Sequence, residues 1–170
     1  SSARVHVLSR RHALMPELIS ASGIQPTLSS RTKPSVLRDM VKVAEKTGLL
    51  FDPADLLKSL EEREKMCSTA LPGGMSLLHP RNHEPYMFSD SFIALARTVQ
   101  PIHAGALDGK PTDIFFLLCC QDDRIHLHVL ARLCTMCQST RLLQNLRRAE
   151  DALSMQNYIY ESELEVVRNL

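Results

Sequence analysis

Residues 113–120 read DIFFLLCC, and every residue after Asp113 is apolar. A strand with one face in water alternates apolar and polar residues, whereas a strand covered on both faces is apolar almost throughout. The run is bounded by the turn sequence LDGKP at residues 107–111 and by QDD at residues 121–123. We therefore expect a central strand here, with a layer of helices against each face of its sheet.

Two further segments are expected to be strands: residues 75–78 (MSLL) and residues 91–99 (SFIALARTV). Five segments have the three- and four-residue apolar spacing or the capping signals of helices. They are residues 31–48 with Pro34 in the first turn, 51–66 with Asp52 and Pro53 at the start, 125–136 after Asp122 and Asp123, 140–150, and 151–167. Helices between and after buried strands predict an α/β fold, a single-domain sandwich in which a central mixed β-sheet is flanked by helices on both faces.

The composition is that of an ordinary globular protein. The 170 residues are 44% hydrophobic, and 20 basic against 19 acidic side chains give a formal charge of +1. This balance gives no reason to expect direct nucleic-acid binding, and the longest apolar runs are too short to span a bilayer. Five cysteines without a secretory signal predict free thiols and a cytoplasmic location. Because the chain begins SSARVHVLSRRH, we expect a part of a longer protein, with residues 1–13 a tail or interdomain linker and residues 14–170 the domain.

Two histidines lie where chemistry is plausible on physical grounds. His79 ends the strand MSLL, directly before Pro80, in the segment STALPGGMSLLHPRN at residues 68–82. In the helix at residues 125–136, His126 lies on the apolar face and His128 on the opposite, polar face. The apolar face holds Val129, Leu130, Leu133 and Cys137, and the polar face holds Arg124, Arg132 and Thr135. His126 is therefore either a hydrogen-bonded core histidine or one of a converging pair with His79, since a neutral imidazole is a nucleophile.

Two blocks of sequence resemble a known family. They are EREKMCSTALPGGMSLLHP at residues 62–80 and DGKPTDIFFLLCCQDDRIHLHVLARL at residues 108–133. Together they resemble the enzyme IIA domain of the mannitol/fructose and nitrogen-regulatory type, a component of the bacterial phosphoenolpyruvate-dependent sugar phosphotransferase system. The segments HPRN and CCQDDRIHLHVLARL are most similar to a subgroup in which this domain follows an excisionase-like DNA-binding domain.

The resemblance implies a phosphohistidine relay and assigns roles to residues of this chain. His79 stands at the position of the phosphorylated histidine, His126 at that of the second active-site histidine, and Arg63 at that of the arginine near the phosphoryl group. Thr69, Gly73 and Gly74 are implied to line the phosphoryl site, the glycines by letting the backbone approach its oxygens. The implied donor is a histidine phosphocarrier protein, and the implied acceptor is a sugar permease domain or a regulatory protein. Neither a cofactor nor a metal is implied.

The chain departs from the family pattern in the glycine loop. Relatives typically read TGIGxGxAxPH, whereas residues 69–79 of this chain read TALPGGMSLLH. The loop thus contains Pro72, which has no backbone N–H and a restricted φ, and Leu78 precedes the histidine. His79, His126 and Arg63 are all retained.

Two alternatives are weighed against the relay. A zinc site could use His79 with His83, His126 with His128, or Cys134 with Cys137, but Pro80 and Pro85 disfavour a helix that would align the first pair. A single CxxC late in an amphipathic helix is a weak metal or redox signal, and core cysteines explain it better. The other alternative is a non-catalytic regulatory or interaction module that keeps the enzyme IIA fold and controls a partner or a fused DNA-binding domain.

Overall fold

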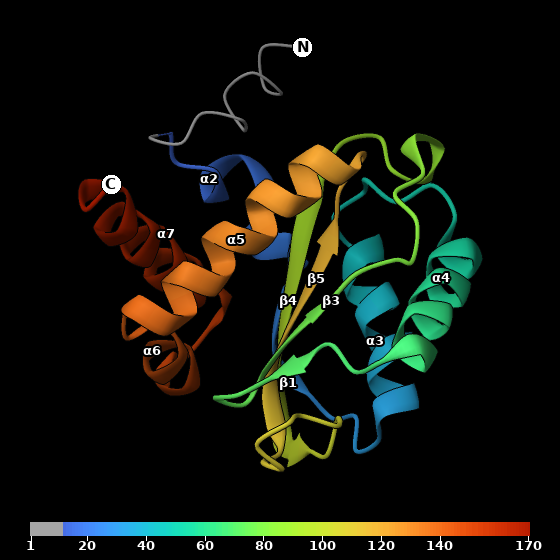
Figure 1. Ribbon diagram of the computed structural model, residues 1–170, viewed down its shortest axis with the longest axis horizontal. Helices are drawn as coiled ribbons and strands as arrows, with labels where there is room; N and C mark the ends of the chain where they lie inside the picture. Colours follow the sequence, from blue (N-terminus) through green and yellow to red (C-terminus); the bar gives the residue numbers. More distant parts are fainter. Residues whose placement is uncertain (1–11) are drawn as a thin grey trace.

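The computed structural model describes residues 12–170, so most of the expected tail at residues 1–13 lies outside the described residues (Figure 1). Its centre is a five-stranded mixed sheet with the strand order β1-β4-β5-β3-β2. The strands are β1 (Ile24–Leu28), β2 (Ala70–Leu71), β3 (Met75–Leu78), β4 (Phe92–Ile102) and β5 (Thr112–Cys119). β4 and β5 are antiparallel, while β1 runs parallel to β4 and β3 runs parallel to β5. The predicted fold class is confirmed.

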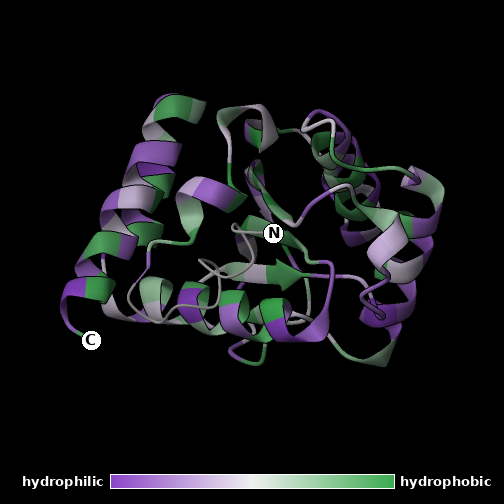
Figure 2. Cartoon of the chain, turned by 90° about the horizontal axis from the view of Figure 1, so that it is seen from above, coloured by the Kyte–Doolittle hydropathy of each residue, from purple (hydrophilic) through white to green (hydrophobic). Residues whose placement is uncertain are grey.

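Helices cover both faces of the sheet (Figure 1). α3 (Lys33–Glu45) and α4 (Pro53–Met66) lie on one face. On the other face lie α2 (Met15–Leu18), α5 (Asp123–Ser139), α6 (Leu142–Arg148) and α7 (Ala152–Arg168). Short 3-10 turns occur at Ala21–Gly23 and Pro85–Met87. The helices carry both hydrophilic and hydrophobic residues, as expected for elements with one face on a core (Figure 2).

The central strand β5 contributes to a hydrophobic core on each side of the sheet. Phe116 and Leu118 belong to the cluster under α5, α6 and α7, whereas Phe115 and Leu117 belong to the cluster under α3 and α4. Successive side chains of a strand point to opposite faces, so an all-apolar strand requires a helical layer on both. The prediction of a doubly covered central strand is confirmed.

The predicted helix starts are also confirmed. The side chains of Thr32, Asp52, Asp122 and Asp151 cap α3, α4, α5 and α7, each accepting a hydrogen bond from a backbone N–H three residues later. These bonds satisfy donors that the first turn of a helix leaves free. Asp122 fixes the start of α5 and therefore the position of His126, the fourth residue of that helix.

Arg132 was expected on the outward, polar face of its helix, and this expectation is wrong. Its side chain is buried, and Nη1 lies 2.9 Å from Oε2 of the fully buried Glu163 on α7. Glu163 also accepts hydrogen bonds from the backbone N–H groups of Leu14 and Met15. A paired carboxylate allows a guanidinium to be buried, and periodicity alone does not reveal the partner.

Of the helices between residues 12 and 170, none is both long enough and apolar enough to traverse a lipid bilayer.

Candidate functional site

His79 directly follows β3, where the strand ends at Leu78. Its Nδ1 lies 2.9 Å from the carbonyl oxygen of Leu77. A carbonyl can only accept, so Nδ1 carries the proton in this pair and Nε2 of the neutral ring keeps its lone pair. The local backbone thus selects the tautomer in which Nε2 is the nucleophilic atom.

Arg63 in the last turn of α4 lies beside that lone pair. Its Nε donates to Nε2 of His79 at 3.1 Å, and its Nη1 donates to the carbonyl oxygen of Cys67 at 2.9 Å. The second bond satisfies a carbonyl group at the C-terminal end of α4 and fixes the guanidinium in place. The remaining N–H groups of the guanidinium are suited to an oxyanion, because the planar fork matches phosphate oxygens.

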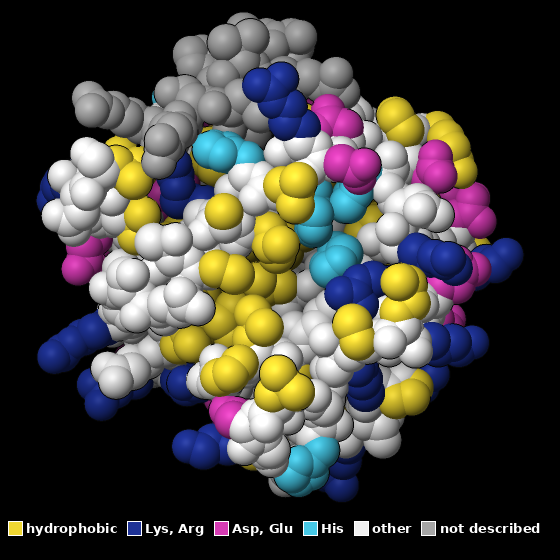
Figure 3. Space-filling view, viewed as in Figure 1, with side chains coloured by type: hydrophobic (Ala, Val, Ile, Leu, Met, Phe, Trp, Pro, Cys, Tyr) yellow, Lys and Arg dark blue, Asp and Glu magenta, His cyan; other side chains and the backbone are white. Residues whose placement is uncertain are grey.

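His126 reaches the same place from the start of α5. It is buried, and its ring centroid lies 4.7 Å from that of His79 with the two planes tilted by 47°. The structure therefore places His79, His126 and Arg63 together, although they come from three different elements. Figure 3 shows histidine side chains gathered at the surface of this face beside Lys or Arg side chains.

His83 is a third histidine of this cluster, and the sequence analysis did not place it there. Its ring centroid lies 4.3 Å from that of His126 and 6.5 Å from that of His79. Its Nδ1 lies 2.7 Å from Oδ1 of Asp123, the first residue of α5. Residues 79–84 are not helical, as expected from the prolines. The available signal was the brevity of the segment HPRNH, because a short turn can return a residue to the same site without a helix.

The surroundings of the rings favour their neutral forms. Burial lowers the pKa of His126 to about 3, with further lowering by His83 and His79. Burial also lowers the pKa of His79, and the neighbouring Arg63 guanidinium and His83 ring lower it further, while the hydrogen bond to Leu77 opposes them. Both groups are therefore unprotonated at neutral pH, which keeps Nε2 of His79 available as a nucleophile.

Thr69, which the resemblance implies at the phosphoryl site, forms its hydrogen bonds with Glu64 and Ser76. Its buried hydroxyl donates to the carboxylate of Glu64 and lies 2.9 Å from the hydroxyl oxygen of Ser76. Glu64 also forms an ion pair with Lys33 at 2.6 Å. These contacts compensate the negative charge of Glu64, the residue after Arg63. The hydroxyl of Thr69 is already hydrogen-bonded to Glu64 and Ser76.

Gly73 and Gly74 lie at the opposite end of β3 from His79. The carbonyl oxygen of Gly73 accepts a hydrogen bond of 2.6 Å from Nη2 of Arg147, which also pairs with Asp113. A strand rises about 3.3 Å per residue, so five residues separate Gly74 from His79 by roughly 16 Å. The structure thus does not bring these glycines to the imidazoles.

The other candidate ligands of a metal do not join this cluster. His128 borders a separate pocket with Ala131 and Val166, while Cys134 and Cys137 border an apolar pocket with Leu71 and Leu143. Across residues 12–170, no group of three or more His, Cys, Asp or Glu side chains has an arrangement that could hold a metal ion.

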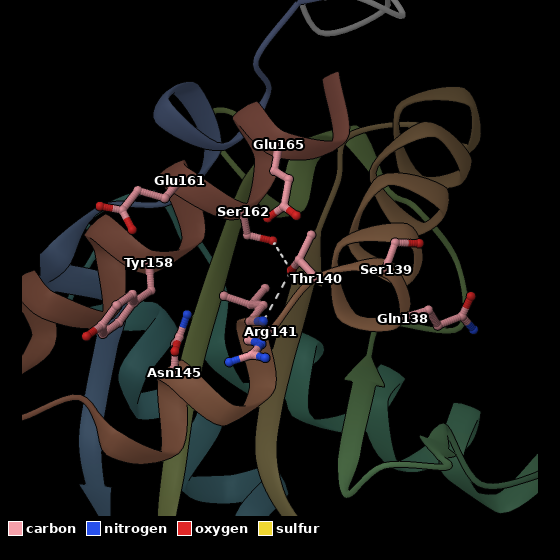
Figure 4. Close-up of a pocket in the computed structure, with 10 residues that line it drawn as sticks. Gln138, Ser139, Thr140, Arg141, Asn145, Tyr158, Glu161, Ser162 and Glu165 are labelled. Atoms are coloured by element: carbon pink, nitrogen blue, oxygen red, sulfur yellow. Dashed lines mark hydrogen bonds between the residues drawn. The ribbon is translucent and has the colours of Figure 1, made fainter. Parts of the chain in front are cut away.

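A larger polar pocket of about 480 Å³ lies between the end of α5, α6 and α7 (Figure 4). Arg141, Tyr158 and Glu161 lie around it, and the hydroxyl groups of Thr140 and Ser162 are 2.7 Å apart in its wall. At 1.5 Å per residue along α5, Ser139 is roughly 20 Å from His126. This pocket is therefore separate from the histidine cluster.

Comparison with known proteins gives one family. The model described as "Phosphoenolpyruvate-dependent sugar phosphotransferase system, EIIA 2" matches residues 17–162, which is more than half of the chain.

Two curated relatives illustrate the range of the family. The PTS system fructose-specific EIIABC component of Bacillus subtilis is 26% identical over 136 residues, which are 79% of this chain and 21% of that protein. The chain thus spans about a fifth of the length of that relative. A nitrogen regulatory protein homolog of Haemophilus influenzae is 28% identical over 141 residues, which are 80% of this chain and 84% of that protein.

Solved structures agree in fold. Nitrogen regulatory protein IIA-Ntr from Neisseria meningitidis superposes with a TM-score of 0.73 at 22% identity, covering 86% of this chain and 99% of that one. Enzyme IIAMTL in its complex with phosphorylated enzyme IIBMTL from Escherichia coli superposes with a TM-score of 0.73 at 12% identity, covering 84% and 97%. Together with the family match, these findings show that the chain belongs to the type 2 EIIA family of the phosphoenolpyruvate-dependent sugar phosphotransferase system.

Proposed function

We propose that this domain accepts a phosphoryl group on Nε2 of His79 from a histidine phosphocarrier protein and relays it to a sugar permease domain or a regulatory protein in the cytoplasm. One observation carries the proposal. The Leu77 carbonyl leaves the lone pair on Nε2 of His79, and Arg63 and His126 both contact the same ring.

The transfer step needs only these groups. The lone pair on Nε2 forms the new N–P bond, while the N–P bond of the donor breaks and its electron pair returns to the donor imidazole. The proton on Nδ1 stays in its hydrogen bond to the Leu77 carbonyl. Because the broken and formed bonds are of the same kind, the step is nearly balanced in energy and no nucleotide is consumed in the domain.

Arg63 and His126 assist by stabilising charge on the phosphoryl oxygens. When phosphorus occupies Nε2, the Nε–H of Arg63 loses its acceptor lone pair on the ring, and the guanidinium, held by the Cys67 carbonyl, can donate to the phosphoryl oxygens instead. His126 is neutral, so it offers one N–H donor and restricts the rotation of the His79 ring by contact. Preorganised donors of this type each contribute about 10²–10³-fold to a rate.

The regulatory module without chemistry is the less favoured alternative. A module of that kind does not require a nucleophilic tautomer with an arginine at its lone pair, and the structure contains both. We also propose, as the regulatory setting, an excisionase-like DNA-binding domain upstream in the same polypeptide, which the resemblance of residues 79–82 and 119–133 suggests. Isolation of the natural full-length polypeptide and mass measurement test that setting.

Incubation with ³²P-phosphoenolpyruvate, enzyme I and the histidine phosphocarrier protein tests the relay. We expect base-stable, acid-labile label on the wild type and none on His79→Ala. His128→Asn is the matched control, since His128 is a histidine of α5 that borders another pocket. An unlabelled wild type, with donor proteins from its own source, would refute the relay and favour the regulatory module.

Arg63 and His126 are tested by initial rates. Arg63→Met should slow labelling by about 10²–10³-fold, and Arg63→Lys should recover only part of this, because Lys lacks the planar fork. His126→Asn should slow labelling while circular dichroism stays unchanged. If His126→Asn instead unfolds the protein, the ring is a core residue and its proposed role is wrong.

A further inference from the structure

We propose that His83, oriented by Asp123, is a third functional imidazole of the phosphoryl site and takes up one proton from solvent when His79 is phosphorylated. This inference rests on the proposed function and adds a proton-coupled step to it. His83 acts through the electrostatic field at the phosphoryl group and through contact with His126, so it is a positioning residue rather than the acceptor.

The three imidazoles form a triangle. Its short sides join His126 to His79 and to His83, at 4.7 and 4.3 Å between centroids, and its long side of 6.5 Å joins His79 to His83. The His79 and His83 rings are nearly parallel, with 16° between their planes. The His83 ring thus lies at the edge of the roughly 4–6 Å range in which a negative charge on the neighbouring group favours the protonated form.

His83 differs from the other two rings in having a carboxylate partner. Its side chain is 7% exposed, and Nδ1 donates to Asp123 at 2.7 Å. A carboxylate at one nitrogen favours protonation of the other, as in carboxylate–histidine pairs in enzymes. Within residues 12–170, the buried Nε2 of His83 has no hydrogen-bond partner. The neutral ring therefore has a vacant acceptor at Nε2, and the protonated ring has a donor there.

The remaining groups around the triangle cannot serve as well. Burial lowers the pKa of both His79 and His126, the latter to about 3, so these two rings resist a proton. The charged side chains that act on His79 and His126 come from two elements. They are Arg63 and Glu64 from α4 and Asp123 from α5, while Arg81 and Glu84 are neighbours of His83 in the sequence.

Two of these charges are already matched. Glu64 is paired with Lys33 and Thr69, and Arg81 lies 4.0 Å from Glu62. Arg63 is the fixed positive charge at the nucleophile. A transferred PO₃ unit brings one additional negative charge into this half-buried site, and one proton at Nε2 of His83 neutralises it. The proton comes from water, and no oxidant or other reactant is required.

NMR titration of ¹³C,¹⁵N-histidine-labelled protein tests the inference directly. The titration midpoint of the His83 ring is measured before and after phosphorylation, once with the phosphocarrier relay and once with phosphoramidate as a chemical donor. We expect the midpoint to rise by about one unit on phosphorylation, as for a charge at this separation. Asp123→Asn should lower the midpoint in both states, because the carboxylate is lost.

Asp55→Asn is the matched control. Asp55 is an exposed carboxylate in the first turn of α4, as Asp123 is in the first turn of α5, and each helix keeps its own capping aspartate. If any charge in the first turn of a helix changed the titration midpoint of His83, both variants would change it. The proposed His83–Asp123 pair predicts a change in Asp123→Asn alone.

Linkage gives a second readout. On this proposal His83 binds its proton more tightly when His79 is phosphorylated, so a low pH favours phosphorylation. The gain is complete at pH values below the His83 titration midpoint of the unphosphorylated protein. It is lost at pH values above the His83 midpoint of the phosphorylated protein. Between pH 8 and pH 5, the equilibrium ratio of labelled to unlabelled protein should rise up to about tenfold more in the wild type than in His83→Gln. If His83→Gln does not fold, Asp123→Asn, at an exposed position, carries the same comparison.

The outcomes separate the inference from the proposed function. An unchanged His83 midpoint, or proton uptake at His126, overturns the inference and leaves the relay standing. Labelling by phosphoramidate but not by the phosphocarrier overturns the relay, and the titration of the chemically phosphorylated protein still decides the inference. No labelling by either donor overturns both.

Discussion

Replacing Glu163 by Gln tests whether the buried ion pair holds α2, α5 and α7 together. Glu163 is fully buried on α7, and its two carboxylate oxygens accept three hydrogen bonds. Leu14 N donates at 2.8 Å and Arg132 Nη1 at 2.9 Å to Oε2, and Met15 N donates at 3.0 Å to Oε1. Gln keeps the volume of the side chain, removes its charge and converts one acceptor into a donor.

The expected loss follows from these contacts. One oxygen becomes an NH₂ group that faces another donor, so at least one buried N–H is left without an acceptor, at a cost of about 1–3 kcal/mol. The buried guanidinium of Arg132 also loses its counter-charge, and breaking a buried pair in this way costs about 3–5 kcal/mol in all. A domain of this size is stable by only about 5–15 kcal/mol, so the variant should be near the limit of folding.

Urea unfolding followed by circular dichroism measures the effect. With an m-value of about 2 kcal/mol/M, the midpoint should fall by about 1.5–2.5 M. Glu161→Gln, an exposed change on the same helix, should stay within about 0.5 kcal/mol of the wild type. The double variant Arg132→Met, Glu163→Gln removes the guanidinium together with the carboxylate charge, keeps an amide oxygen as acceptor for the backbone N–H groups of Leu14 and Met15, and should therefore recover part of the loss. A Glu163→Gln variant within 1 kcal/mol of the wild type would refute the proposed role of the pair.

Three further predictions concern the site and its loop. Because the pKa of His79 lies below its ordinary value of about 6.5, labelling by phosphoramidate should lose less than half of its rate as the pH falls from 8 to 6.5, and a loss of half or more at pH 6.5 would contradict this. Thr69→Val should lower stability by about 1–3 kcal/mol in urea, since the Glu64 carboxylate loses a donor, and should leave labelling intact; lost labelling in a folded variant would restore Thr69 to the site. Gly74→Ala should cost about 1–3 kcal/mol, because Gly74 has φ +82° and a Cβ there would lie 2.6 Å from Arg147 Nη2. Gly109→Ala, at φ +70° in open space, gives the backbone contribution alone, and equal losses would show that the contact with Arg147 does not matter.

The central part of the fold could be predicted because its determinants are local. Residues 113–120 are apolar without alternation, which requires a cover on both faces, and the capping residues Asp52 and Asp122 mark the starts of their helices. β1 escaped prediction because Pro26 interrupts its pattern. Proline is tolerated there because β1 is an edge strand that pairs with β4 alone.

The candidate site could be predicted only in part, because its contacts join residues distant in sequence. Helical phase separates His126 from His128, and the structure places them in different surroundings. Helical phase left His126 as either a core histidine or a partner of His79, and only the resemblance favoured the second and gave the placement of Arg63. The sequence does not reveal His83, because an i,i+4 pair outside a helix has no fixed geometry, and the loop returns the ring to the cluster through a hydrogen bond to Asp123 on α5.

The altered glycine loop and the proposed phosphoryl site occupy opposite ends of β3. At one end, Pro72 and Gly73 border an apolar pocket with Leu143, and Arg147 holds the Gly73 carbonyl. At the other end, His79 is oriented by Leu77 and Arg63. A substitution in the loop therefore changes the packing against α6 and leaves the atoms around Nε2 of His79 in place. Because the four residues of β3 are paired with β5 along their whole length, the strand keeps the two ends at a fixed separation. The sequence of the glycine loop can therefore change without changing the residues of the proposed transfer site. The presence of His79, His126 and Arg63 is thus a better indicator of the proposed relay than the glycine pattern.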